Sequence, residues 1–194
     1  GELHMMRAPC VVLILVAAAA AQSGPCSWSV VSSAPFGLND NVDRLRVLDD
    51  GSGAALYALG AFLSISAPVV KWDGTTWTPM PVGTAGGGAT DITVFDDGSG
   101  PALYISTIAA PGASSVLRWN GSAWVDPPGG GPSGSNMRAL AVIDYGNGPR
   151  LMAAGIFDGG IHEYDGISWV VRDTVSVPSG CTPSIEALHT WDYG

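Results

Sequence analysis

Short apolar segments separated by polar, glycine-containing turns recur along this chain. One such stretch runs from Val47 to Gly60, where an Asp-Asp-Gly-Ser-Gly segment separates two apolar segments. Similar stretches start at Val94 and Val142, and a fourth starts near Trp191. Short apolar segments on both sides of a glycine-containing turn predict a β-hairpin. The leading aspartates, at positions 49, 96, 144 and 192, lie 47, 48 and 48 residues apart.

Each complete stretch is followed by a second one that has aromatic residues around a turn. The first copy spans 70–77, with Asp73-Gly74 at its centre, and the later copies span 117–124 and 162–169. Asp-Gly or Asn-Gly between such segments predicts a hairpin with a two-residue type I′ turn. In that register Trp72 faces Thr75 and Val70 faces Trp77, so all four share one side of the sheet. The equivalent sets are Leu117, Trp119, Ser122 and Trp124, then His162, Tyr164, Ile167 and Trp169.

Two hairpins per repeat make four antiparallel strands every 47 or 48 residues, which is typical of a β-propeller blade. We therefore predict an all-β fold: a partial β-propeller of about three four-stranded blades, an N-terminal outer strand and the start of a fourth blade. The blades are expected at about 42–82, 89–128 and 137–173, and the fourth from about 185. A β-sandwich of short strands is the alternative. We expect the repeated tryptophans to pack between blades; the other interpretation is that one of them lines a sugar site.

The ends of the repeat array predict an incomplete ring. The segment 26–31 resembles a last blade strand, because Trp28 precedes Trp77 by 49 residues. No complementary strands complete its blade, so residues 22–194 are expected to form an incomplete propeller whose closing blades lie in a missing part. In this layout Cys26 and Cys181 lie on opposite rims. We therefore expect each of them to form a disulfide with a cysteine in the missing part rather than with the other.

The first segment is expected to be a targeting signal rather than part of the fold. Met5-Met6-Arg7 precedes an apolar run over 11–21, and alanines before Gln22 offer a cleavage site. This is the pattern of a secretory signal peptide, so residues 1–21 are set apart from the fold. A membrane anchor is the alternative, although the run is shorter than the ~20 residues that span a bilayer. Residues 1–4, before these methionines, are interpreted as an expression remnant or a mis-set reading frame. We predict a secreted, periplasmic or cell-surface protein.

The repeat resembles the kelch-type propeller repeat, as found in propeller arrays of exported bacterial proteins. The resemblance covers about residues 26–194. It rests on Gly60 and Gly155 at the end of a second strand and on the aromatic pairs of the following hairpin, whereas Thr107 replaces the glycine in the second repeat. The resemblance implies the fold and leaves the role open. A second resemblance, to the Asp-box turn of sialidase-type propellers, differs by one residue in the spacing from Asp73 to Trp77 and implies a structural turn.

Charge and composition argue against nucleic acids as partners and leave few candidate catalytic residues. The formal net charge is −9 and Lys71 is the only lysine, so the basic surface that nucleic acids require is missing. After the signal segment the histidines are His162, expected in the core, and His189, which aligns with the inner-strand positions 46, 93 and 141. No catalytic, cofactor-binding or metal-binding residue is predicted, because most aspartates lie at turns, where they bond to the backbone.

Three further segments have both a structural and a functional interpretation. Asp49-Asp50-Gly51 could bind calcium but offers too few oxygen ligands for a calcium loop, and the acidic and amide-rich segment 39–43 could bind calcium or form an exposed loop. Asn120-Gly121-Ser122 fits the N-glycosylation pattern, and it also fits a turn. We expect loops and turns in all three places.

The sequence thus predicts an exported binding or scaffold module with an unknown protein or glycan ligand and no cofactor. The alternative is part of a carbohydrate-active propeller enzyme, a glycosidase or lyase, whose catalytic residues lie in missing blades. Further plain repeats downstream would favour the module. Clustered Arg, Glu and Tyr on inner strands would favour the enzyme.

Overall fold

The computed structural model describes residues 38, 41–49, 53–62, 67–83, 86–110, 112–132, 136–156, 160–179 and 181–189 of the chain. Within these ranges the chain forms twelve β-strands and no helix, which confirms the predicted all-β class. The segment 26–31, Cys26 and the signal-like segment 1–21 lie outside the described residues.

The strands form three four-stranded units, each made by one copy of the repeat. Unit 1 contains β1 (Val42–Asp49), β2 (Ala54–Gly60), β3 (Val69–Trp72) and β4 (Trp77–Pro79). Unit 2 contains β5 (Gly86–Asp96), β6 (Pro101–Ala109), β7 (Val116–Trp119) and β8 (Trp124–Val125). Unit 3 contains β9 (Asn136–Asp144), β10 (Pro149–Ile156), β11 (Gly160–Tyr164) and β12 (Trp169–Thr174). Consecutive strands within each unit pair antiparallel.

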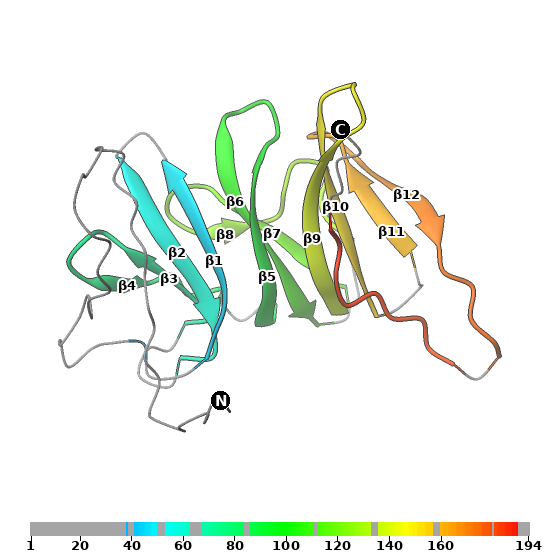
Figure 1. The fold of residues 1–194 in the computed structure, drawn as a ribbon, viewed down its shortest axis with the longest axis horizontal. Helices are drawn as coiled ribbons and strands as arrows, with labels where there is room; N and C mark the ends of the chain where they lie inside the picture. Colours follow the sequence, from blue (N-terminus) through cyan, green and yellow to red (C-terminus); the bar gives the residue numbers. More distant parts are fainter. Residues whose placement is uncertain are drawn as a thin grey trace, which may run out of the picture.

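The three units stand side by side in a propeller-like arrangement (Figure 1). Their first strands β1, β5 and β9 follow one another across the view, and β5 contacts both of the others. The last strands β4 and β12 lie toward the outside of the molecule. Units 2 and 3 are also joined into one eight-stranded sheet, because Ile108 of β6 pairs with Asn136 of β9.

Apolar side chains fill the spaces between neighbouring units. Between units 1 and 2 the buried cluster contains Tyr57, Leu59, Ile105 and Trp124, with Trp119 packed against it. Two tryptophans are also bonded to the connection that precedes their own unit. The indole Nε1 of Trp124 donates to the carbonyl oxygen of Met80 (3.3 Å), and that of Trp169 donates to Gly130 (3.0 Å). Rings of this size bury 150–250 Å² each, so they contribute strongly to joining the units.

The predicted register of the second hairpins is wrong. Trp72 pairs with Trp77 and Val70 pairs with Pro79, so four residues, 73–76, form the loop. The carboxylate of Asp73 explains this, because its Oδ1 accepts hydrogen bonds from the backbone N–H groups of Thr75 and Thr76, both at 2.8 Å. A type I′ turn needs positive φ at both central residues, and only glycines have positive φ among the described residues.

The same loop recurs in the other units and changes which residues share a face. Trp119 pairs with Trp124, and Tyr164 pairs with Trp169. The aromatic pairs therefore lie directly opposite each other on one side of each sheet, with ring centroids 4.8–5.3 Å apart. Thr75, Ser122 and Ile167, which were expected on that side, lie in exposed loops.

The first hairpins are closed by aspartate side chains, as the turn interpretation predicts. Oδ1 of Asp96 accepts hydrogen bonds from the N–H groups of Gly98 (2.8 Å) and Gly100 (3.0 Å). Asp144 does the same for Gly146 and Gly148, and Asp49 accepts from Gly53. These carboxylates replace backbone acceptors in the loop, which explains why Asp recurs at this position.

Candidate functional site

The inner strands of the three units are tied together by one buried carboxylate. Asp91 on β5 is 5% exposed. Its Oδ1 accepts from Nε of Arg44 on β1 (3.2 Å), and its Oδ2 accepts from the backbone N–H of Leu140 on β9 (2.9 Å). A buried carboxylate is stable only when its oxygens are paired in this way. Asp91 therefore links the first strands of all three units.

A cavity of about 420 Å³ opens beside this link, along the inner strands. It is lined by Arg46, Val47, Thr93, Val94, Leu140, Ala141, Val142, Leu188 and His189. The four positions that the repeat spacing aligns, 46, 93, 141 and 189, all lie in this wall. The sequence alignment of His189 with the inner strands is thereby confirmed, although residues 185–189 form no regular strand. We call this space the axial cavity.

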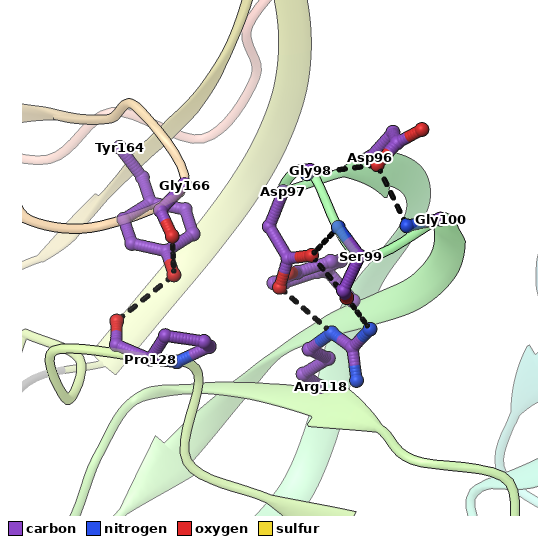
Figure 2. Close-up of polar contacts among 10 residues, drawn as sticks. Asp96, Asp97, Gly98, Ser99, Gly100, Arg118, Pro128, Tyr164 and Gly166 are labelled. Carbon is purple, nitrogen blue, oxygen red and sulfur yellow. Dashed lines mark hydrogen bonds and ion pairs between the residues drawn. The ribbon is translucent and has the colours of Figure 1, made fainter.

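A second polar cluster lies at the loop rim of unit 2 (Figure 2). The carboxylate of Asp97 accepts from the N–H of Ser99 (3.0 Å) and from the hydroxyl of Tyr104 (2.9 Å), and it forms an ion pair with Nε of Arg118 (3.0 Å). Burial works to raise the pKa of Asp97, but the hydrogen bonds from Ser99 and Tyr104 and the charge of Arg118 hold this pKa below its usual range. Burial, together with Asp97, raises the pKa of the Tyr104 hydroxyl.

The loop of unit 3 closes over this cluster. The hydroxyl of Tyr164 lies 2.9 Å from the carbonyl oxygens of both Pro128 and Gly166, and its single proton is shared between these two acceptors (Figure 2). A side chain at Gly166 would place its Cβ 2.7 Å from the carbonyl oxygen of Asp97, so the two loops are in close contact. Burial and the charge of Asp97 raise the pKa of Tyr164 to about 12. The loop of unit 3 therefore packs against the loop that carries Asp97.

A cleft of about 410 Å³ lies at the same rim, between units 1 and 2. Asp49, Ser99, Arg118, Trp119 and Asn120 are among the residues that line it. Trp119 is only partly buried, whereas the equivalent Tyr164 is fully enclosed. The aromatic side chain at this position is thus buried in unit 3, as Tyr164, and borders an open cleft in unit 2, as Trp119. We call this space the rim cleft.

The remaining predicted residues fall outside these two spaces. His162 is 9% exposed and pairs in the sheet with Ala153 and Val171, a buried position as expected. Cys181 is exposed and forms no disulfide with another described residue. Asn120 accepts from the N–H groups of Ser122 and Ala123, both at 2.9 Å, so its amide closes a turn.

The expected calcium loops are only partly within the described residues. Asp49 bonds to its own loop, whereas Asp50, Gly51, Asn39 and Asp40 lie outside. In the described ranges no three His, Cys, Asp or Glu side chains gather into a group that could hold a metal ion.

Loop carboxylates are held ionised by the loops that they close. Hydrogen bonds from the backbone N–H of Thr76, and then from Thr75, lower the pKa of Asp73. The N–H groups of Ser168 and Ile167 lower the pKa of Asp165 in the same way. A general acid needs a pKa near the working pH. These two carboxylates therefore do not suit that role.

Two charged links were not found by reading the sequence. Arg44 and Asp91 hold equivalent positions in successive repeats, 47 residues apart, with opposite charge. Such a pair could have been found by aligning the charged residues of neighbouring repeats. The pairing of Asp97 with Arg118 has no such signal, because these residues lie on different hairpins of one unit.

No family model, curated protein or solved structure matches this chain. No helix with the length and apolarity needed to cross a bilayer is present among the described residues.

Proposed function

We propose that this chain is an exported part of a β-propeller and acts as a binding or scaffold module whose ligand enters the axial cavity. The observation that carries the proposal is the convergence of equivalent inner-strand positions on one cavity. Repeated units then supply different side chains to a shared site, while the sheets behind them hold the site in place. A cavity of about 420 Å³ is within the usual range of small-molecule pockets.

The kelch-type resemblance and the expected start of a fourth blade are part of the proposal. An isolated bridge pairs Ile156 with Ser184. It lies 48 residues after the bridge of Ile108 to Asn136, with which the first strand of unit 3 begins. Residues 184–189 thus follow the course of a first strand. This supports a further blade beside unit 3, where Val170 and Val171 are 49% and 54% exposed.

Export is proposed from the sequence pattern at 5–22, which resembles a signal peptide. Measuring the N-terminal residue of the secreted protein would test it. Cleavage after the alanines at 19–21 is expected, and an uncleaved cytoplasmic product would contradict export.

The second candidate, a carbohydrate-active enzyme, is favoured by the rim cleft. A partly exposed indole beside a guanidinium and a carboxylate can hold a sugar ring, because the ring packs on the indole while its hydroxyls bond to charged groups. In the rim cleft Trp119 lies beside Arg118 and Asp49. Arg118 is already paired with Asp97, however, and Asp49 with its loop. We therefore rank this function second.

One experiment separates the two functions. The purified full chain is incubated with a panel of soluble polysaccharides, peptides and small organic acids, and both binding and new products are measured by mass spectrometry. Val47→Trp fills the axial cavity from an exposed position, and Ile167→Trp is the matched control on an exposed loop.

Stoichiometric binding without products, lost in Val47→Trp and kept in Ile167→Trp, supports the binding module. Hydrolysis of a polysaccharide that is abolished by Trp119→Ala would overturn it in favour of the enzyme. Binding that Val47→Trp leaves unchanged would move the site away from the axis.

A further inference from the structure

The wall of the axial cavity consists of three layers of equivalent positions from successive repeats. One layer is aliphatic, one is mixed and one consists of valines. The layers are Leu140 and Leu188; Arg46, Thr93, Ala141 and His189; and Val47, Val94 and Val142. The mixed layer, which carries the polar side chains, therefore lies between two apolar layers.

The charge in this wall has one sign. Arg46 and His189 are the only ionisable side chains among the described lining residues, and both are cationic when charged. The nearby carboxylate of Asp91 is occupied by Arg44 and by the N–H of Leu140. In a chain with 17 acidic and 8 basic residues, this is a local reversal of the overall charge.

Arg46 is also oriented. One of its terminal nitrogens donates to the carbonyl oxygen of Leu45 (2.8 Å), which restrains the side chain on β1. A restrained guanidinium loses less freedom when it pairs with an anion, and its planar fork matches the two oxygens of a carboxylate. The neighbouring Val47 is 64% exposed, so apolar surface lies open beside the charge.

We propose that the axial cavity binds small organic acids in which a carboxylate is attached to an apolar body. The carboxylate pairs with Arg46 and bonds to the Thr93 hydroxyl, and the apolar body covers the valine layer. This inference rests on the proposed binding function and names its ligand class.

The test uses four probes that separate the head group from the body. Hexanoate, 1-hexanol and hexylammonium share one apolar body, and acetate has the head group alone. Each probe is titrated into the full chain and followed by NMR of backbone amides. We expect hexanoate to bind at least about tenfold more tightly than the other three, with the largest shifts at Val47, Thr93 and Val142.

Two variants locate the charge contribution. Arg46→Gln is expected to weaken hexanoate binding roughly tenfold to a hundredfold, the usual effect of losing a hydrogen bond to a charged group. Lys71→Gln removes the same charge from β3, outside the cavity wall, and should leave hexanoate binding unchanged. Amide spectra of both variants show whether the fold is kept.

The outcomes distinguish this inference from the proposed function. Equal binding of hexanoate and hexanol at the cavity residues would overturn the ligand class and keep the binding module. Equal loss of hexanoate binding in Arg46→Gln and Lys71→Gln would overturn the role of Arg46. If no probe shifts the cavity residues, while a panel ligand binds in a way that Val47→Trp abolishes, only the ligand class fails. If Val47→Trp abolishes no binding at all, both fail.

Discussion

At the scale of single residues, two enclosed carboxylates hold strands together. Asp91 connects β5 to β1 and β9 across units, and Asp97 connects its loop to Tyr104 and Arg118 within unit 2, where the loop of unit 3 packs against it. Both carboxylates are almost enclosed, with side-chain exposures of 7% and 2%. Enclosed charges of this kind are costly when a partner is removed, so their loss should be measurable.

Replacing Asp91 by alanine should destabilise the protein strongly. The N–H of Leu140 would lose its acceptor in a buried place, and Arg44 would lose its partner. We expect the free energy of unfolding to fall by about 2–4 kcal/mol. Denaturant unfolding measures the change, with Asp43→Ala as the control because Asp43 is exposed and precedes Arg44 on β1. A loss no larger than in the control would contradict the role of Asp91.

The folded protein should be less stable in acid, because Asp97 becomes protonated there. A carboxyl group whose pKa is lowered by folding stabilises the fold above its unfolded pKa, and this contribution is lost as the pH falls through the folded pKa. The pKa of Asp97 is lowered in this way. The free energy of unfolding should therefore fall below about pH 4, where an unperturbed Asp titrates.

Asp97→Asn isolates this contribution. We expect the variant to be less stable than the parent at pH 7 and to lose less stability between pH 7 and pH 3 in urea unfolding. Asp126→Asn removes an exposed carboxylate and is the control. An equal loss in acid for parent and Asp97→Asn would contradict the assignment.

At the scale of elements, the sequence predicts the hairpins well and their registers less well. The Asp-Gly and Asn-Gly signals mark three turns correctly. A dipeptide does not reveal that the side chains of Asp73, Asn120 and Asp165 accept hydrogen bonds from the backbone amides two and three residues later, which extends each loop to four residues. The aromatic faces could be predicted because a pair of tryptophans on either side of a turn shares a face in both registers.

The glycine at the end of the second strand shows why an element needs a particular residue. A Cβ on Gly155 would lie 2.0 Å from the carbonyl oxygen of Asn136, and one on Gly60 would lie 2.0 Å from that of Asn41. Thr107 takes this place in unit 2, where the pairing of β5 with β6 has two register shifts instead of one. The extra register shift in unit 2 therefore occurs in the unit where Thr107 carries a side chain and the other two units have glycine.

Substituting Gly155 by alanine should therefore destabilise the fold. Backbone atoms would have to move to make room for the methyl group, and we expect a loss of about 1–3 kcal/mol in the free energy of unfolding. Gly88→Ala is the control, since a Cβ there meets no atom within 4 Å. Thermal and denaturant unfolding of the two variants should differ clearly, and equal stabilities would refute the close approach.

At the scale of the whole molecule, the repeat spacing explains how distant residues reach one cavity. Positions 46, 93, 141 and 189 are far apart in the chain and meet at one cavity, the first three on β1, β5 and β9 and the last in a segment without regular strand structure. The location of this candidate site could be predicted from the spacing. Its volume and its single sign of charge could not, because they depend on how close the three sheets stand and on which oxygen of Asp91 each neighbour occupies.

The most direct test of the account is an experimentally determined structure of the full chain by X-ray crystallography. The account predicts three four-stranded units side by side, the indole of Trp124 buried between units 1 and 2, the partly buried indole of Trp169 packed against the apolar cluster between units 2 and 3, and Arg46, Thr93 and His189 around one cavity. Indole rings exposed to solvent, or repeats that fold into sheets facing each other as in a sandwich, would contradict it.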